Sequence, residues 1–167
     1  MPVSLQVHVR SVTVARRPLL GLAHAVLSLV GQSAADMTLS LVGDRRMRQL
    51  NRRFRRKDCS TDVLAFAFRE ARAPHGFNQA AAYLGDVVIA MPTARRQARA
   101  AGRPLEDELV TLLIHGVLHL CGYDHERSRP EASRMQKKER QMRRRLGPIA
   151  PLFRPSHHRP MRTTNEG

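Results

Sequence analysis

The sequence predicts a single α+β domain in which a mixed sheet of about four strands packs with about five helices. Its 167 residues suffice for one domain with a substantial core. Short segments alternate apolar and polar residues with a period of two, which is typical of strands, and longer segments repeat apolar residues every three or four positions, which is typical of helices. Because both kinds of segment recur along the chain, we expect helices packed on a sheet.

The first 41 residues contain two predicted strands and one predicted helix. Residues Val3–Val9 alternate apolar and polar side chains, which indicates a half-buried first strand. The mostly apolar segment Pro18–Val30 is expected to form a helix, which Gly31 can end. Residues Met37–Leu41 then repeat the period of a strand.

The segment from Asp44 to Lys57 predicts a helix with two different faces. It reads D-R-R-M-R-Q-L-N-R-R-F-R-R-K and holds eight basic side chains and one acidic side chain. Asp44 can cap its start. Met47, Leu50 and Phe54 share a helical stripe, so we expect them to pack on the core while the opposite face stays cationic.

The second half of the chain adds two strands and three helices. Two short apolar runs flank the loop of residues 69–80 and predict strands, whereas Gly102 separates a short helix from a long apolar one. A last, basic helix begins at Pro130. The predicted elements are the strands Val63–Phe68 and Leu84–Met91 and the helices Thr93–Ala101, Leu105–Cys121 and Pro130–Leu146.

The end of the chain differs in composition from the rest. From Pro148 onward it is rich in proline and polar residues and has no period, which indicates a disordered, basic tail. We therefore expect one domain over residues 1–147 and a tail over residues 148–167. His157 and His158 lie in this tail, and we do not expect them to bind the metal.

The chain is strongly basic. It has 29 Lys and Arg against 14 Asp and Glu, a formal net charge of +15. Further basic residues gather between Arg134 and Arg145 and between Arg95 and Arg103, so the charge belongs to the folded body. This balance favours a polyanionic partner such as nucleic acid. An acidic membrane surface is the competing partner, and part of the charge could serve solubility alone.

The two cysteines, Cys59 and Cys121, are too few for a disulfide framework and are expected to be free thiols. A reducing cytoplasm suits them. The N-terminal residues lack the pattern of a signal peptide, and no apolar run approaches the length of a membrane span. We expect a soluble, cytoplasmic protein that does not enter membranes.

Three histidines near the end of the long apolar helix have the spacing of a metal site. His115 and His119 are four residues apart and would share one helix face. Gly122 can turn the chain so that His125 reaches the same ion. Three ligands leave one position of a tetrahedral zinc open, which is typical of a catalytic site. Nickel, copper or cobalt would also accept these ligands.

Two neighbouring residues are less suited to bind the ion. Cys121 follows His119 by two positions and points to another side of the helix, so we expect it to pack. Asp124 is open to three interpretations, as a partner of a ligand N–H, as an acid or base, or as a turn residue.

The spacing H-x-x-x-H-x-x-G-x-x-H is also that of the metzincin proteases. In those enzymes the residue after the first histidine is the glutamate that acts as general base, whereas this chain has Gly116. A metallohydrolase of the metzincin type is therefore a weak alternative.

Residues 115–125, H-G-V-L-H-L-C-G-Y-D-H, resemble the motif of the YbeY family of bacterial rRNA maturation endoribonucleases. Residues 51–66, N-R-R-F-R-R-K-D-C-S-T-D-V-L-A-F, resemble a second family segment, and residues 84–89, L-G-D-V-V-I, resemble a family strand. Departures are small: Phe54 stands where Tyr is common, Ala65 where Ser is common, and Cys59 precedes Ser60 where the family often has Pro.

This resemblance implies a zinc-dependent, single-strand-specific endoribonuclease that matures the small-subunit rRNA 3′ end and acts in ribosome quality control. It implies that His115, His119 and His125 bind one Zn²⁺ and that Arg55 lies in the active-site cleft, so that Arg55, His115 and His119 are the expected catalytic residues. The implied partners are single-stranded RNA, rRNA and the small ribosomal subunit. Asp62, Asp86 and Asp124 are possible supporting carboxylates.

The residues leave other readings open. A non-catalytic ribosome assembly factor would bind rRNA through the same basic faces and use zinc only for stability. Aromatic residues make up 4% of the chain, so recognition is expected to depend on phosphate and RNA shape more than on base stacking. The sequence does not decide between water and a ribose 2′-OH as nucleophile, nor does it indicate the cleavage site or the oligomeric state.

Overall fold

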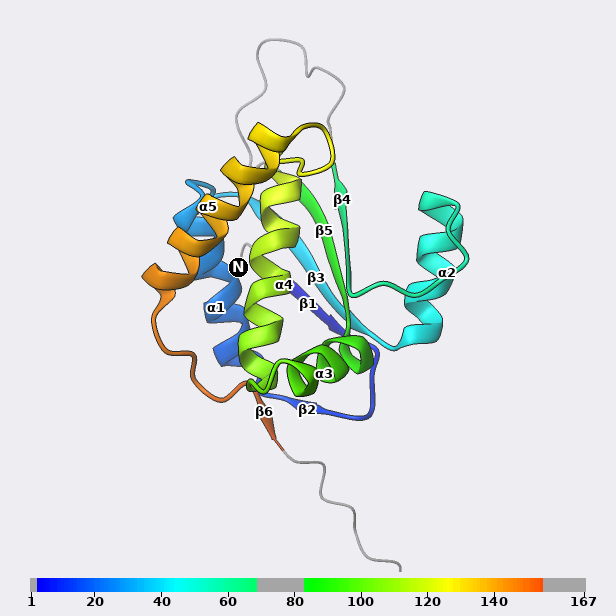
Figure 1. Ribbon diagram of the computed structural model, residues 1–167. Helices are drawn as coiled ribbons and strands as arrows, with labels where there is room; N and C mark the ends of the chain where they lie inside the picture. Colours follow the sequence, from blue (N-terminus) through cyan, green and yellow to red (C-terminus); the bar gives the residue numbers. More distant parts are fainter. Residues whose placement is uncertain (1–2, 69–82, 155–167) are drawn as a thin grey trace, which may run out of the picture.

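Four strands form a mixed sheet in the order β1-β3-β5-β4 (Figure 1). The computed structural model describes residues 3–68 and 83–154. Strands β1, β3 and β5 run parallel to one another, and β4 pairs with β5 in the antiparallel direction. The strands are β1 (Val3–Val7), β3 (Asp36–Val42), β4 (Val63–Ala67) and β5 (Tyr83–Ala90). Each lies within two residues of its predicted bounds.

Five helices pack with this sheet in the described part of the chain. They are α1 (Arg16–Leu29), α2 (Asp44–Arg55), α3 (Met91–Ala100), α4 (Leu105–Leu120) and α5 (Arg129–Leu146). Helices α1, α4 and α5 cover one face of the sheet, whereas α2 stands apart from them beside β4 (Figure 1). The predicted α+β fold is confirmed.

The strand register explains the alternating sequence. In β3, Met37, Leu39 and Leu41 are buried in the core that the sheet forms with α1, α4 and α5. Thr38 and Ser40 lie between them and so face the other side of the sheet. A smaller apolar cluster on that other side joins the sheet to α2.

Helix α4 approaches the sheet closely at Gly116. A Cβ atom at this position would lie 2.6 Å from Cγ1 and 3.1 Å from Cγ2 of Val87 on β5. It would also lie 3.4 Å from Cγ2 of Val63 on β4. Glycine therefore lets the histidine-bearing turn of α4 rest directly on the sheet.

A second, two-stranded sheet was not predicted. Strand β2 (Thr13–Val14) pairs in the antiparallel direction with β6 (Phe153–Arg154). Leu152 is buried, and its carbonyl accepts a hydrogen bond of 2.8 Å from the backbone N–H of Ala15.

The expectation of a disordered tail from Pro148 was therefore wrong for residues 148–154. The apolar side chain of Leu152 has a place in the core, which a scan for periodicity does not detect in so short a segment. Residues 155–167, with His157 and His158, lie outside the described residues, as does the predicted loop of residues 69–80.

Helix α2 departs from its prediction in two details. The residue at its N-cap position is Gly43, and the carboxylate of Asp44 instead accepts hydrogen bonds of 2.8 Å from Thr93 and from Arg96 of α3. Met47 is fully buried, but Phe54 is 56% exposed. The predicted cap at Asp44 and the burial of Phe54 were wrong. The ring of Phe54 contacts that of Phe66 on β4, with 5.1 Å between the ring centres, but the rest of its surface is open to solvent.

No helix in residues 3–68 and 83–154 is long and apolar enough to cross a bilayer.

Candidate metal centre and its pocket

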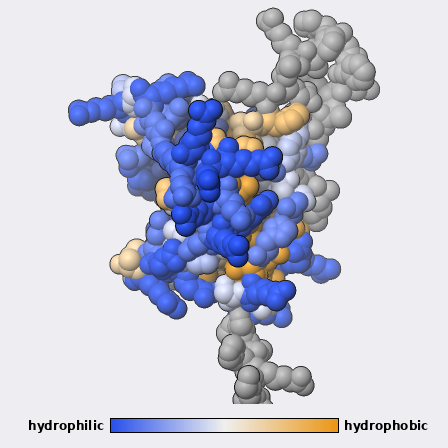
Figure 2. Space-filling view, turned by 90° about the vertical axis from the view of Figure 1, so that its right-hand side faces the viewer, coloured by the Kyte–Doolittle hydropathy of each residue, from blue (hydrophilic) through white to orange (hydrophobic). Residues whose placement is uncertain are grey.

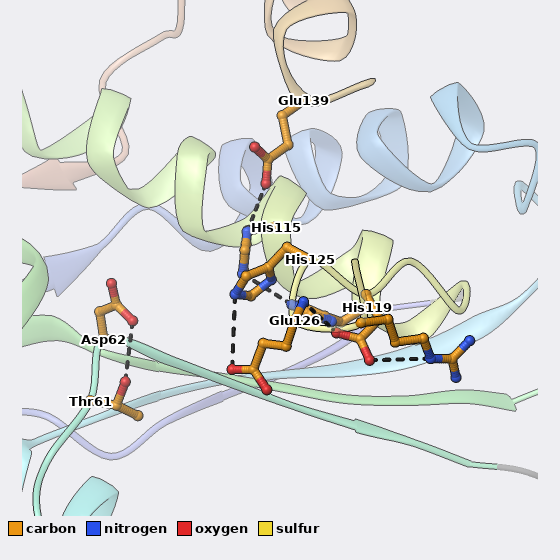
Figure 3. A network of polar contacts seen from close by, with 9 residues as sticks. Thr61, Asp62, His115, His119, His125, Glu126 and Glu139 are labelled. Atoms are coloured by element: carbon orange, nitrogen blue, oxygen red, sulfur yellow. Dashed lines mark hydrogen bonds and ion pairs between the residues drawn. The ribbon is translucent and has the colours of Figure 1, made fainter. Parts of the chain in front are cut away.

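The structure brings His115, His119 and His125 together. His115 and His119 lie one turn apart on α4, which ends at Leu120. Gly122 has a φ of +93°, a conformation that glycine adopts without strain, and this turn brings His125 back to the two helical histidines (Figure 3). His115 and His119 are half-buried, whereas His125 is exposed.

The distances between the imidazoles suit a single ion. One ring nitrogen from each histidine lies within 4.8 Å of the others, and the Nε2 atoms of His115 and His119 are 3.1 Å apart. Two nitrogens bound to one tetrahedral zinc, each at about 2.1 Å, are about 3.4 Å apart. Shifts of less than about 2 Å in the imidazole positions would therefore let all three rings bind one ion.

The protonation of His119 also suits a ligand. Burial lowers the pKa of this imidazole, and the neighbouring His115 and His125 lower it further. Asp124 opposes these effects, and the cation of Arg55 adds to them. The neutral ring, which is the form that binds metals, is thus favoured.

Glu139 of α5 orients the first histidine. Its carboxylate accepts a hydrogen bond of 2.7 Å from Nδ1 of His115, which leaves Nε2 directed at the other two histidines (Figure 3). Carboxylates in this position fix the tautomer of metal-binding histidines and raise their basicity. Glu139 was missed in the sequence because it follows His115 by 24 residues, and only the packing of α5 on α4 brings the two together.

The loop from Cys121 to Arg127 is shaped by Asp124. Its carboxylate accepts a hydrogen bond of 2.9 Å from the backbone N–H of Glu126 and lies 3.4 Å from Nε of Arg127. Asp124 thus acts as a turn residue, which is one of its three possible roles. Cys121 is half-buried against the core as expected, and burial raises the pKa of its thiol. Both cysteines are free thiols in this structure.

A pocket of about 420 Å³ opens beside the three histidines. Arg55, the last residue of α2, lines this pocket together with Lys57 and residues 59–65. The structure thus places all four predicted site residues, Arg55 and the three histidines, around one cavity.

The segment that follows α2 is held against that helix. Asn51 is buried and donates a hydrogen bond of 2.9 Å to the carbonyl of Cys59, and Arg48 forms a bidentate pair with Asp58. Arg56 ends the helix with a φ of 56°, which reverses the chain toward β4. Sequence reasoning missed Asn51, although a polar residue among the apolar positions of a helix is a signal that could have found it.

The two other aspartates have different positions. Asp62 lines the pocket, but its carboxylate accepts hydrogen bonds from the N–H of Val63 and from the amide of Gln97, so it fixes the start of β4. Asp86 accepts a hydrogen bond of 2.7 Å from the hydroxyl of Tyr83. It precedes Val87, which faces Gly116, and therefore lies on the opposite face of the sheet from the histidines.

The surface around the pocket is cationic. Figure 2 shows the side of the molecule that carries α2, where hydrophilic side chains cover most of the face. The last turn of α2 has three basic residues, Arg52, Arg53 and Arg55, all exposed. Such a surface attracts phosphate groups.

The chain is similar to known proteins over most of its length. The sequence model described as Endoribonuclease YbeY matches residues 7–147. Endoribonuclease YbeY of Anaeromyxobacter dehalogenans is 46% identical over 140 residues, which cover 84% of this chain and 69% of the relative. Endoribonuclease YbeY of Aquifex aeolicus is 38% identical over 117 residues, 70% of this chain and 74% of the relative.

A solved structure has the same fold. The solution structure of TM1509 from Thermotoga maritima superimposes with a TM-score of 0.55 at 25% identity, over 83% of this chain and 86% of that chain. The matched span of the family model contains the three histidines, Arg55 and Glu139. This chain belongs to the YbeY endoribonuclease family.

Proposed function

We propose that this protein is a metal-dependent endoribonuclease that cleaves single-stranded RNA in the pocket between α2 and α4. The observation that carries the proposal is that Arg55 and the three histidines line one cavity. A phosphodiester needs a cationic group to hold its charge and a strong electrophile to activate the reaction. Arg55 would supply the first, and a metal ion held by the three histidines would supply the second.

The ion that fits the three histidines best is zinc. The ligands are all imidazoles, and Glu139 fixes the tautomer of the first. When bound, zinc polarises a phosphoryl oxygen or makes water more acidic, which are both useful in phosphodiester cleavage. His115, His119 and His125 would hold it.

Arg55 would hold the scissile phosphate. Its guanidinium presents a planar set of N–H donors that matches two phosphate oxygens, and its charge offsets the negative charge that builds up during the reaction. The nearby ammonium of Lys57 would attract the same group. The hydrogen bond from Asn51 to Cys59 would hold the pocket-lining segment that follows Lys57 against α2.

The substrate follows from the charge and the shape of the site. The cationic surface of α2 suits an RNA backbone, and a short single strand can enter the pocket more easily than a duplex. The family resemblance implies rRNA as the substrate, with maturation of the small-subunit 3′ end, ribosome quality control and a cytoplasmic location as the biological setting.

The geometry of Gly116 weakens the peptidase alternative. A glutamate side chain at this position would collide with Val87, so the general base of the metzincin proteases cannot be accommodated without rearrangement of α4 or β5. No feature of the described residues favours the non-catalytic assembly factor over the nuclease, and the experiment below distinguishes the two.

The test is cleavage of a single-stranded RNA that spans the small-subunit rRNA 3′ end. Wild type is compared with His115→Ala and Arg55→Glu, and with Arg45→Glu, which makes the same charge change on an exposed residue at the other end of α2. Circular dichroism checks the folding of each variant. We expect a loss of at least about 100-fold in the first two and a small change in the third. Equal cleavage by all four proteins would indicate a contaminating nuclease and favour the assembly factor.

A further inference from the structure

A second basic surface lies on α5, outside the pocket of the histidines. It forms a groove of about 750 Å³ whose lining includes Tyr123 and Gln141. The cations that line it are Arg134, Lys137, Lys138, Arg140, Arg144 and Arg145. The groove has no acidic lining residue among the described parts of the chain. Six cations in one groove repel each other, and an anionic ligand would relieve this repulsion.

The cations follow one side of the helix. Five of the six cations, at positions 134, 137, 138, 144 and 145, together with Gln141 recur every three or four residues, which places them along one stripe, and Arg140 lies at its edge. The stripe extends over about 16 Å at 1.5 Å per residue. The opposite face of α5 holds the buried Met135 and Met142 and the Glu139 that contacts His115. One helix thus supports the candidate metal centre and carries the basic stripe.

The groove is next to the candidate active site. Tyr123 lies in the turn between His119 and His125, and its ring forms part of the groove. The guanidinium of Arg134 lies 5.4 Å from the centre of this ring. A flat ring beside a guanidinium is the kind of surface on which an unpaired base stacks. Tyr123 thus joins the groove to the turn that carries His125.

A membrane surface explains the groove less well. Helices that bind at a lipid interface insert an apolar face, but the apolar face of α5 is buried in the core. Among the described residues, the large exposed apolar side chains are Phe54 and Phe68, and neither lies on α5. The groove therefore offers charge and a ring edge, which suits a nucleic-acid backbone.

We propose that the basic groove of α5 is a second binding site for the RNA substrate, which holds the phosphates of the strand that flanks the cleaved bond. The proposal rests on the proposed function. It predicts that long RNA binds more tightly than short RNA, because only a long strand can reach both the pocket and the groove.

The test compares two triple variants with the same charge change. The groove variant is Arg134→Glu/Lys137→Glu/Arg144→Glu, and the control is Arg10→Glu/Arg17→Glu/Arg99→Glu, which changes exposed residues outside the groove and the pocket. Binding of fluorescent single-stranded RNAs of about 30 and about six nucleotides is measured by anisotropy over a series of salt concentrations. Thermal melts check that all proteins are folded.

We expect the groove variant to bind the long RNA at least about tenfold more weakly than the control does, with a much smaller difference for the short RNA. Its slope of log affinity against log salt should fall by about 2, because each lost phosphate contact contributes about 0.7 for a single strand. Equal RNA affinities and equal salt slopes for the two variants would overturn the proposal. Binding of the wild type to anionic phosphatidylglycerol vesicles would not change this conclusion. RNA cleavage by the wild type tests the proposed function separately. The RNA site on α5 and the nuclease function can therefore be refuted independently of each other.

Discussion

Glu139 and His115 form a hydrogen bond of 2.7 Å that joins α5 to the candidate metal centre. Both side chains are partly exposed, at 27% and 29%. The bond fixes the orientation of the imidazole, so α5 contributes to the site although it supplies none of the three histidines.

The substitution Glu139→Gln is expected to weaken metal binding by about 10- to 100-fold, because the amide cannot stabilise the proton on Nδ1 as the carboxylate does. The measurement is competition for Zn²⁺ with a chelator of known affinity. Glu126→Gln is the matched control, since Glu126 is 70% exposed and lies 4.0 Å from His125. Equal affinities for Glu139→Gln and the control would contradict the role given to Glu139.

The contact between Gly116 and Val87 predicts a pair of compensating substitutions. Gly116→Ala is expected to destabilise the fold by about 1–3 kcal/mol, because the new methyl group meets a branched side chain that cannot move away. Adding Val87→Ala should recover part of this loss. Urea denaturation of the two single variants and the double variant measures the coupling. Additive effects would show that the two positions do not collide.

Much of the fold was accessible from the sequence. The alternation in β1 and β3 and the glycines after α1 and α3 are local signals, and each predicted the element that the structure shows. The three histidines were equally accessible, because helical spacing and one glycine determine their geometry.

The remaining features depend on contacts between distant segments. Glu139 reaches His115 only through the packing of α5 on α4, and β6 pairs with β2 across almost the whole chain. Asp44 was predicted to cap its own helix, but it binds Thr93 and Arg96 because α3 packs beside α2. A reading of local pattern cannot detect such partners.

Asn51 is expected to be important for both stability and activity. Asn51→Ala removes the hydrogen bond to the carbonyl of Cys59, so the pocket-lining segment that follows α2 loses its support. The free energy of unfolding is expected to fall by about 1–3 kcal/mol. Chemical denaturation measures the stability, and RNA cleavage measures the activity at a temperature at which the variant is folded. Gln49→Ala, an exposed change on the same helix, serves as the control. Similar results for both variants would exclude the supporting role.

The stability that Asp44 contributes should depend on pH. Burial raises the pKa of this carboxyl, but the hydrogen bonds from Thr93 and Arg96 outweigh burial and hold it below the usual value of 3.8. A lowered pKa means that the contribution is fully present above 3.8 and disappears as the pH falls through the folded-state value.

Asp44→Asn is therefore expected to destabilise the protein by up to about 1 kcal/mol at neutral pH, and the difference from wild type should shrink toward acidic pH. Urea denaturation at several pH values checks this. A difference that stays constant with pH would show that the charge of Asp44 does not contribute to stability.

The most direct test of the central claim is a titration of the metal-free protein with Zn²⁺ while RNA cleavage is followed. The protein is first stripped with a chelator, and the folding of the stripped form is checked by circular dichroism. We predict that cleavage is lost on stripping, returns with added Zn²⁺ and saturates at one ion per chain, and that His125→Ala does not recover under the same conditions. Full cleavage by the stripped wild type, or equal recovery by His125→Ala, would contradict the assignment of the three histidines as a catalytic metal centre.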